Sequence, residues 1–255
     1  MKTTLLCSLL AFSAPCLFAA DLAALAENES KLEHAALRSD ADALKPLVAQ
    51  AEADLAAAPS DPALQYERAF AYYAEASVSR ARQEKEQAAK SLDTAMKILE
   101  KISDPAWEVE AMALRGYLMN QMIGLKGMSS AMSYGPKSSA LLSKAKTKAP
   151  ANPRVQFFNG VVLITTPEMF GGDLAGGIGA VEGAVASYDR ASGPAVPRWG
   201  EAEALAWLGI AKQKTGDAAG AKAAWERALA IEPEYGWVKY VLLPSLEKTA
   251  AGAKK

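Results

Sequence analysis

Apolar residues recur at helical spacing along most of the chain, and the pattern is clearest between Ala202 and Pro233. Two helical stretches flank a Gly-Asp pair there. The apolar or small residues that share a helix face are Leu205, Leu208 and Gly209 in the first stretch, and Ala221, Trp225 and Ala228 in the second. This spacing is typical of amphipathic helices. Because Gly209 and Ala221 are small, the two helices can approach closely, with Trp225 filling the space beside them.

Three earlier helix starts are marked by Asp-Pro or Asn-Pro, at Asp61, Asp104 and Asn152. Asp and Asn cap helix N-termini, and Pro is well suited to the first helical turn. We expect the closing helices of these units at 92–102, 138–148 and 174–191, and insertions between paired helices at 124–136 and 166–173. One or two further helices over 31–58 begin the stack, and the apolar segment 237–246 caps it.

The unit from Ala202 to Pro233 resembles a tetratricopeptide repeat (TPR), with its Leu-Gly pair, its Ala, aromatic and Ala positions and its terminal Pro. It departs from the pattern at Lys212, where the family usually has an aromatic residue. The segments NPRVQFFNG, TPEMFGGD, PRWGEAEALAWLG and WVKYVLLPSL resemble exported bacterial TPR proteins over about Asp61 to Leu246. The resemblance implies an all-α, TPR-like solenoid of antiparallel helix pairs that binds partners without catalytic activity of its own.

The first twenty residues resemble a secretory signal peptide, with a positive start, an apolar stretch over 5–17 and small residues before position 21. We therefore expect a periplasmic or secreted protein that is cleaved near Ala20. The bond itself stays open because Phe18, three residues before that cut, is not small. Pro15 directly before Cys16 argues against a lipid anchor. The expected organisation is a signal peptide (1–20), an N-terminal helical segment (21–60), a TPR-like domain with a capping helix (61–247) and a flexible tail (248–255).

Composition narrows the classes of function. The 54 alanines favour closely packed helices. With 28 Lys and Arg against 29 Asp and Glu there is no basic excess, so we expect no nucleic-acid partner. After signal cleavage we expect no transmembrane segment. Both cysteines lie in the first twenty residues and the chain has one histidine. We therefore expect no metal site, no cofactor and no enzyme.

Three features could carry chemistry, and each has a structural explanation. His34 could be a base or a ligand, but we interpret it as a surface helix residue. The glycines at 171–183 lack the Gly-Lys-Ser/Thr of a phosphate loop, and we interpret Gly176, Gly179 or Ala180, Gly183 and Ser187 as a closely packed helix face. Thioethers can bind copper(I), but we interpret the Met cluster as gap-filling residues under a loop. Its members are Met119, Met122, Met128 and Met132.

The concave face is the remaining candidate site, because the first helix of each unit lines this face in TPR arrays. The resemblance implies the binding candidates Tyr66, Phe70, Tyr73, Glu110, Tyr117, Asn120, Gln121, Arg154 and Phe157, with Val161, Ile164, Glu203, Ala206 and Gln213 along the same lining. The first three share a helix face at positions i, i+4 and i+7. Aromatic residues serve equally in cores and in binding sites, so both interpretations stay open.

The function expected from these observations is a non-enzymatic interaction or scaffold protein of the cell envelope. It would bind an extended peptide or a partner helix in a concave TPR groove. The alternative is a small-ligand-binding protein associated with periplasmic transport, in which the insertions at 124–136 and 166–173 roof a pocket. The sequence does not identify the partner or the ligand.

Overall fold

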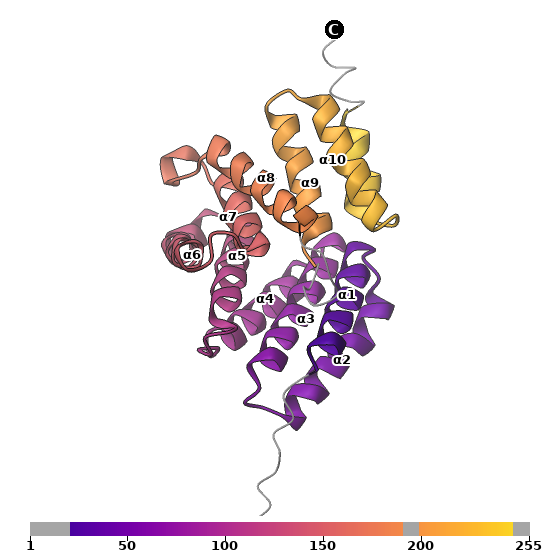
Figure 1. Ribbon diagram of the computed structural model, residues 1–255, viewed down its shortest axis with the longest axis vertical. Coiled ribbons are helices and arrows are strands. Elements are labelled where there is room, and N and C mark those ends of the chain that lie inside the picture. Colours follow the sequence, from indigo (N-terminus) through magenta and orange to yellow (C-terminus); the bar gives the residue numbers. More distant parts are fainter. Residues whose placement is uncertain (1–20, 191–198, 247–255) are drawn as a thin grey trace, which may run out of the picture.

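The computed structural model describes residues 21–190 and 199–246, and every regular element in this part of the chain is a helix. The main helices are α1 (Leu22–Leu37), α2 (Ala41–Ala57), α3 (Pro62–Ala81), α4 (Lys85–Leu99), α5 (Glu108–Lys126), α6 (Met128–Lys148), α7 (Pro153–Thr165), α8 (Leu174–Arg190), α9 (Glu201–Lys214) and α10 (Ala218–Ile231). A 3-10 turn (Glu168–Phe170) precedes α8, and a π-helical stretch (Val238–Leu242) lies within the final helical segment 236–246. Neighbouring helices pack in antiparallel pairs (Figure 1), which confirms the expected all-α helical-repeat fold.

Two of the three expected helix starts are confirmed. The side chains of Asp61 and Asn152 accept hydrogen bonds from the first backbone N–H groups of α3 and α7, and Pro occupies the first position of each helix. The third prediction was wrong by several residues. The Asp104 side chain accepts the N–H of Ala106 at 2.9 Å and closes a turn, so α5 begins only at Glu108.

The expected insertion at 124–136 is wrong. Helix α5 continues to Lys126 and α6 begins at Met128, because Gly127, with a φ of 80°, reverses the chain in one residue. The unit exceeds the usual repeat length because its helices are long, with 19 residues in α5 and 21 in α6. The expected break at 166–173 is confirmed between α7 and α8.

Small residues set the closest helix contacts. Gly209 on α9 faces Trp225 on α10, and a Cβ atom at position 209 would overlap the indole ring, as the sequence pattern predicted. Helices α7 and α8 meet at Gly160 and Gly177, where an added Cβ would lie 2.9 Å from the other glycine's carbonyl oxygen. The packing interpretation holds for Gly183 and Ser187, which face Gln156 on α7, but the closest approach is at Gly177, and Gly179 faces open space.

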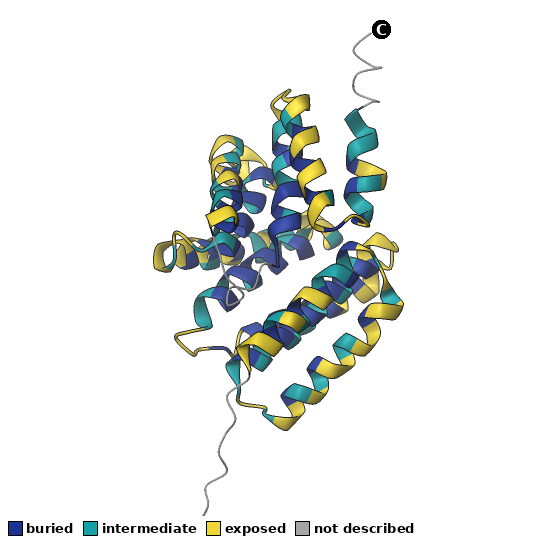
Figure 2. Cartoon of the chain, turned by 45° about the vertical axis from the view of Figure 1, so that its right-hand side comes forward, coloured by how far each residue is buried: buried dark blue, intermediate teal, exposed yellow. Residues whose placement is uncertain are grey.

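The array follows a curved path that brings its last elements back toward its first (Figure 1). The buried faces of the helices turn toward one another and the exposed faces turn outward (Figure 2). The final segment packs on α10 through Val238, as expected of a cap. Its other face carries Tyr240 and Val241, which are 67% and 55% exposed and border the cavity described below.

Candidate functional site

The centre of the inner face is filled by Trp199, two residues before α9 begins. Its ring lies 4.2 Å from Phe70 and 5.9 Å from Phe158, measured between ring centroids, and 6.4 Å from Tyr66. The chain is held there at two points. The Tyr188 hydroxyl donates to the Trp199 carbonyl at 2.9 Å, and the backbone N–H after Trp199 donates to the Glu33 carboxyl at 2.7 Å.

Beneath Trp199 lies a buried ion pair between α5 and α7. Arg154 donates from Nε and Nη2 to the two carboxylate oxygens of Glu110, each at 2.8 Å, and its guanidinium lies 5.0 Å from the centroid of the Trp199 ring. Burial by itself would raise the pKa of Glu110, but Arg154 holds it below its ordinary value. The bidentate geometry and the burial indicate a structural role for this pair.

Beside Trp199 the inner face remains open as a cavity of about 560 Å³. Its walls come from the odd-numbered helices α1, α3, α5 and α9, and residues 235–241, most of them in the final helical segment, close one side. Aromatic rings form much of the lining. Tyr73 and Tyr117 meet edge to face at 5.9 Å, and Trp207 and Trp237 do so at 5.7 Å.

The inner wall of the cavity carries a polar network that is anchored on the buried side chains of Tyr73 and Gln121. The Tyr73 hydroxyl donates to both carboxylate oxygens of Glu203 at 2.9 Å, and Arg80 donates to Gln121. Burial raises the pKa of Glu203 to about 6, although its hydrogen bond from Tyr73 opposes this change. Burial and the neighbouring Glu203 also raise the pKa of Tyr73 well above its ordinary value, so this phenol stays protonated.

Three exposed arginines lie around the same cavity. Arg38 follows the last turn of α1, and Arg80 and Arg82 lie at the end of α3. Helices α1 and α3 run in the same direction, since the antiparallel α2 separates them in the chain, so these ends lie at the same edge of the array. The two acidic residues of the lining are Glu33 and Glu203, and burial raises the pKa of Glu33 to about 8.

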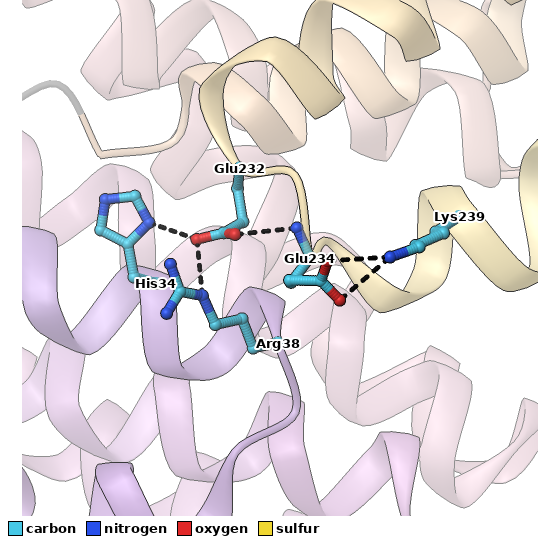
Figure 3. Close-up of polar contacts among 5 residues, drawn as sticks. All are labelled: His34, Arg38, Glu232, Glu234 and Lys239. Carbon is cyan, nitrogen blue, oxygen red and sulfur yellow. Dashed lines mark hydrogen bonds and ion pairs between the residues drawn. The ribbon is translucent and has the colours of Figure 1, made fainter.

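A polar clasp, formed by His34, Arg38 and Glu232, joins the first helix to the connection after α10 (Figure 3). His34 Nδ1 lies 2.6 Å and Arg38 Nε 2.9 Å from the same oxygen of Glu232, which is fully buried. Burial alone would raise the pKa of Glu232, but the N–H of Glu234 and the two α1 side chains hold it below its ordinary value. His34 is therefore a partly exposed helix residue, as expected, that also joins α1 to the connection after α10.

The structure separates the nine binding candidates into two groups. Phe70, Tyr73, Tyr117 and Gln121 line the cavity, and so does Glu203. The candidates outside its lining are Tyr66, Glu110, Asn120, Arg154 and Phe157. Most of this second group is buried: Tyr66 contacts Trp107 and Trp199, and Phe157 contacts neighbouring aromatic rings. Asn120 on α5 instead donates to Thr165, the last residue of α7, at 3.1 Å.

Val161, Ile164 and Ala206 are also core residues, and Gln213 donates to Ser245. Sequence reasoning missed the three arginines, Trp207 and the residues of the final segment. One signal was present: the face that carries Tyr66, Phe70 and Tyr73 continues through Ser77 to Arg80. The neighbouring repeats could not be placed around that face without the structure.

Neither predicted insertion lines the cavity, so the expectation that they roof a pocket is wrong. The segment at 124–136 is helical on both sides of Gly127 and forms no loop that could cover a pocket. The four methionines do not converge, because Met119 and Met122 are buried while Met128 and Met132 are exposed. Among residues 21–190 and 199–246 there is no group of three metal-binding side chains of the His, Cys, Asp or Glu type. No helix in the same part is long and apolar enough to cross a membrane.

The chain resembles known proteins in its three-dimensional structure. No protein-family model matches the chain, and no significant match is found among curated proteins. Among solved structures the chain is similar to the HusA haemophore from Porphyromonas gingivalis, with 26% identity, a TM-score of 0.54 and coverage of 75% of this chain and 94% of that one. MamA (41-end) from Desulfovibrio magneticus RS-1 matches at 15% identity and a TM-score of 0.35, over 84% of this chain and 97% of that one.

Proposed function

We propose that this chain is a non-enzymatic binding protein whose inner cavity holds a small, planar, largely apolar molecule of the tetrapyrrole class, such as haem. The observation that carries the proposal is the 560 Å³ cavity, bordered by Tyr73, Tyr117, Trp207 and Trp237. Its volume is in the range of small-molecule sites, about 300–1,000 Å³. Flat aromatic walls suit a flat conjugated ligand, because ring stacking adds to the burial of apolar surface.

The relationship to a haemophore supports this choice of ligand class, since the chain covers nearly all of that protein. The signal-like residues 1–20 support a location outside the cytoplasm, where a carrier of this kind would meet its cargo. The TPR resemblance of Ala202–Pro233 supports a repeat scaffold whose inner face binds ligand. A ligand carrier must bind its ligand and release it, and neither step requires a catalytic residue.

A titration of the purified protein with haemin tests the proposal. We expect saturable one-to-one binding, a shifted Soret band and quenching of tryptophan fluorescence, because Trp207 and Trp237 border the cavity. Trp207→Ala should weaken binding about tenfold or more, since a stacked aromatic contact contributes about 1 kcal/mol beyond its buried area. Ile231→Ala, a partly exposed apolar residue outside the cavity lining, is the matched control. Absence of saturable binding would refute the proposal.

The second candidate function is recognition of an extended peptide or a partner helix on the inner face. Tyr240 and Val241 favour it, because these exposed apolar side chains border the cavity where a longer ligand would emerge. Filling of the centre by Trp199 opposes it, since the ring shortens the continuous groove. Native mass spectrometry of protein purified gently from its host separates the two. An added mass that corresponds to a small molecule supports the ligand-carrier function, and a co-purified polypeptide at fixed stoichiometry supports the scaffold function.

A further inference from the structure

The side chains around the cavity differ between its inner wall, which is aromatic, and its exposed edge, which carries the arginines and which we call the mouth. Tyr73 and Tyr117 are buried, with 4% and 1% of their surface exposed. The cations Arg38, Arg80 and Arg82 are all exposed. The accessible aromatic surface of the cavity comes from Trp207, Trp237 and Tyr240, and the guanidinium groups form a rim beside it. This arrangement suits an amphipathic ligand that buries a flat apolar body and leaves anionic groups at the surface.

We propose that Arg80 and Arg82 form a carboxylate-recognition rim that orients the ligand and selects anionic tetrapyrroles over neutral ones. This inference rests on the proposed function and specifies which chemical groups of the ligand the protein recognises. Arginine is the appropriate side chain, because its planar guanidinium presents several N–H donors that match the two oxygens of a carboxylate.

The present contacts of these arginines leave donors for a ligand. Arg80 donates from Nη1 to Gln121, which fixes the guanidinium at the cavity wall. Arg82 contacts the exposed Glu84 through Nε at 3.3 Å, so both of its terminal nitrogens lie outside that contact. Arg38 lies in the clasp through Nε, and its terminal nitrogens carry no dashed contact in Figure 3.

The balance of charge around the cavity also favours an anion. The whole chain carries a formal charge of −1, whereas three arginines and two glutamates line the cavity. Because burial raises the pKa of Glu33 to about 8, this carboxyl is largely protonated at neutral pH. Glu203 lies on the inner wall and is engaged by Tyr73. Arg38 and Arg82 already contact the carboxylates of Glu232 and Glu84, so the positive field at the mouth comes mainly from Arg80, which contacts the neutral amide of Gln121.

Two probes of the same ring system test the inference: protoporphyrin IX, which has two carboxylates, and its dimethyl ester, which has none. Wild-type protein should bind the diacid about two- to thirtyfold more tightly than the ester, since two rim ion pairs contribute about 0.2–1 kcal/mol each. Higher salt should reduce this preference, because the charges are exposed. The double variant Arg80→Gln/Arg82→Gln should lose the preference and bind both probes alike.

Two further variants serve as controls. Arg80→Lys/Arg82→Lys keeps the charges and should recover part of the preference, with the same salt dependence. Arg227→Gln removes an exposed arginine that pairs with Asp189 on the outer face and should change neither affinity. The proposed carboxylate-recognition rim would be refuted if wild-type protein bound the two probes with equal affinity, or if the double variant kept the full preference for the diacid. Failure of the wild-type protein to bind either probe would refute the proposed function itself.

Discussion

Glu29 on α1 provides a sharp test of the buried polar interior. Its side chain is 1% exposed, and neither carboxyl oxygen has a hydrogen-bond partner among the described residues. Burial raises the pKa of Glu29 to about 8; nearby Arg154 opposes the change, while Glu110 and Glu67 add to it. The carboxyl should therefore remain protonated in the folded protein at neutral pH, although it ionises in the unfolded chain near its ordinary pKa of 4.5.

The sign of the pH dependence follows from proton binding. Between the two pKa values the native state keeps a proton that the unfolded state loses, so the free energy of unfolding falls as pH rises. The contribution of Glu29 is fully present below its unfolded pKa and is lost as pH rises through its folded pKa. The slope from one such group is about 1.4 kcal/mol per pH unit, which amounts to about 3 kcal/mol between pH 5 and about pH 7.5.

Glu29→Gln removes the titration but keeps the shape of the side chain. Urea unfolding followed by circular dichroism at several pH values should show a slope that is shallower by about 1.4 kcal/mol per pH unit. Some slope should remain, because burial also raises the pKa of Glu33 and of Glu67, to about 8 and about 7. Glu27→Gln, at an exposed residue on the same helix, should leave the slope nearly unchanged. Equal slopes for wild type and Glu29→Gln would refute the reasoning.

Three further predictions concern packing and closure. Gly209→Ala should lower the free energy of unfolding by about 2 kcal/mol in the urea assay, because the added methyl group overlaps Trp225. Its control is Gly179→Ala, which should raise the free energy of unfolding by about 0.5–1 kcal/mol, because the space around Gly179 is open. Trp199→Ala should lower the melting temperature and cost about 3–5 kcal/mol, because it empties the centre of the array; an unchanged melting temperature would contradict this role. Glu232→Gln should weaken the clasp by about 1–2 kcal/mol and increase amide exchange at the end of α1, with exchange in α6 as the internal reference.

Local features of the fold were predictable where the signal lay within one helix or one helix pair. Asp61 and Asn152 were recognisable as caps, since capping depends on a side chain and the backbone two or three residues away. The fit of Gly209 against Trp225 was predictable for a similar reason, because the two helices are joined by a short turn. The insertion at 124–136 was mispredicted because a single glycine at a positive φ can replace a loop, and a repeat can gain length within its helices.

The candidate site was only partly predictable. The sequence alone determined an all-α repeat and the inner-face positions of Tyr73, Tyr117 and Gln121. Tertiary structure decided that Trp199 fills the centre and that the final segment closes the cavity. The physical reason is that helical periodicity assigns a face to each residue, whereas the curvature of the array sets which distant faces meet. Contacts such as those of Glu232 with α1, which join the two ends of the chain, therefore leave no periodic signal in the sequence.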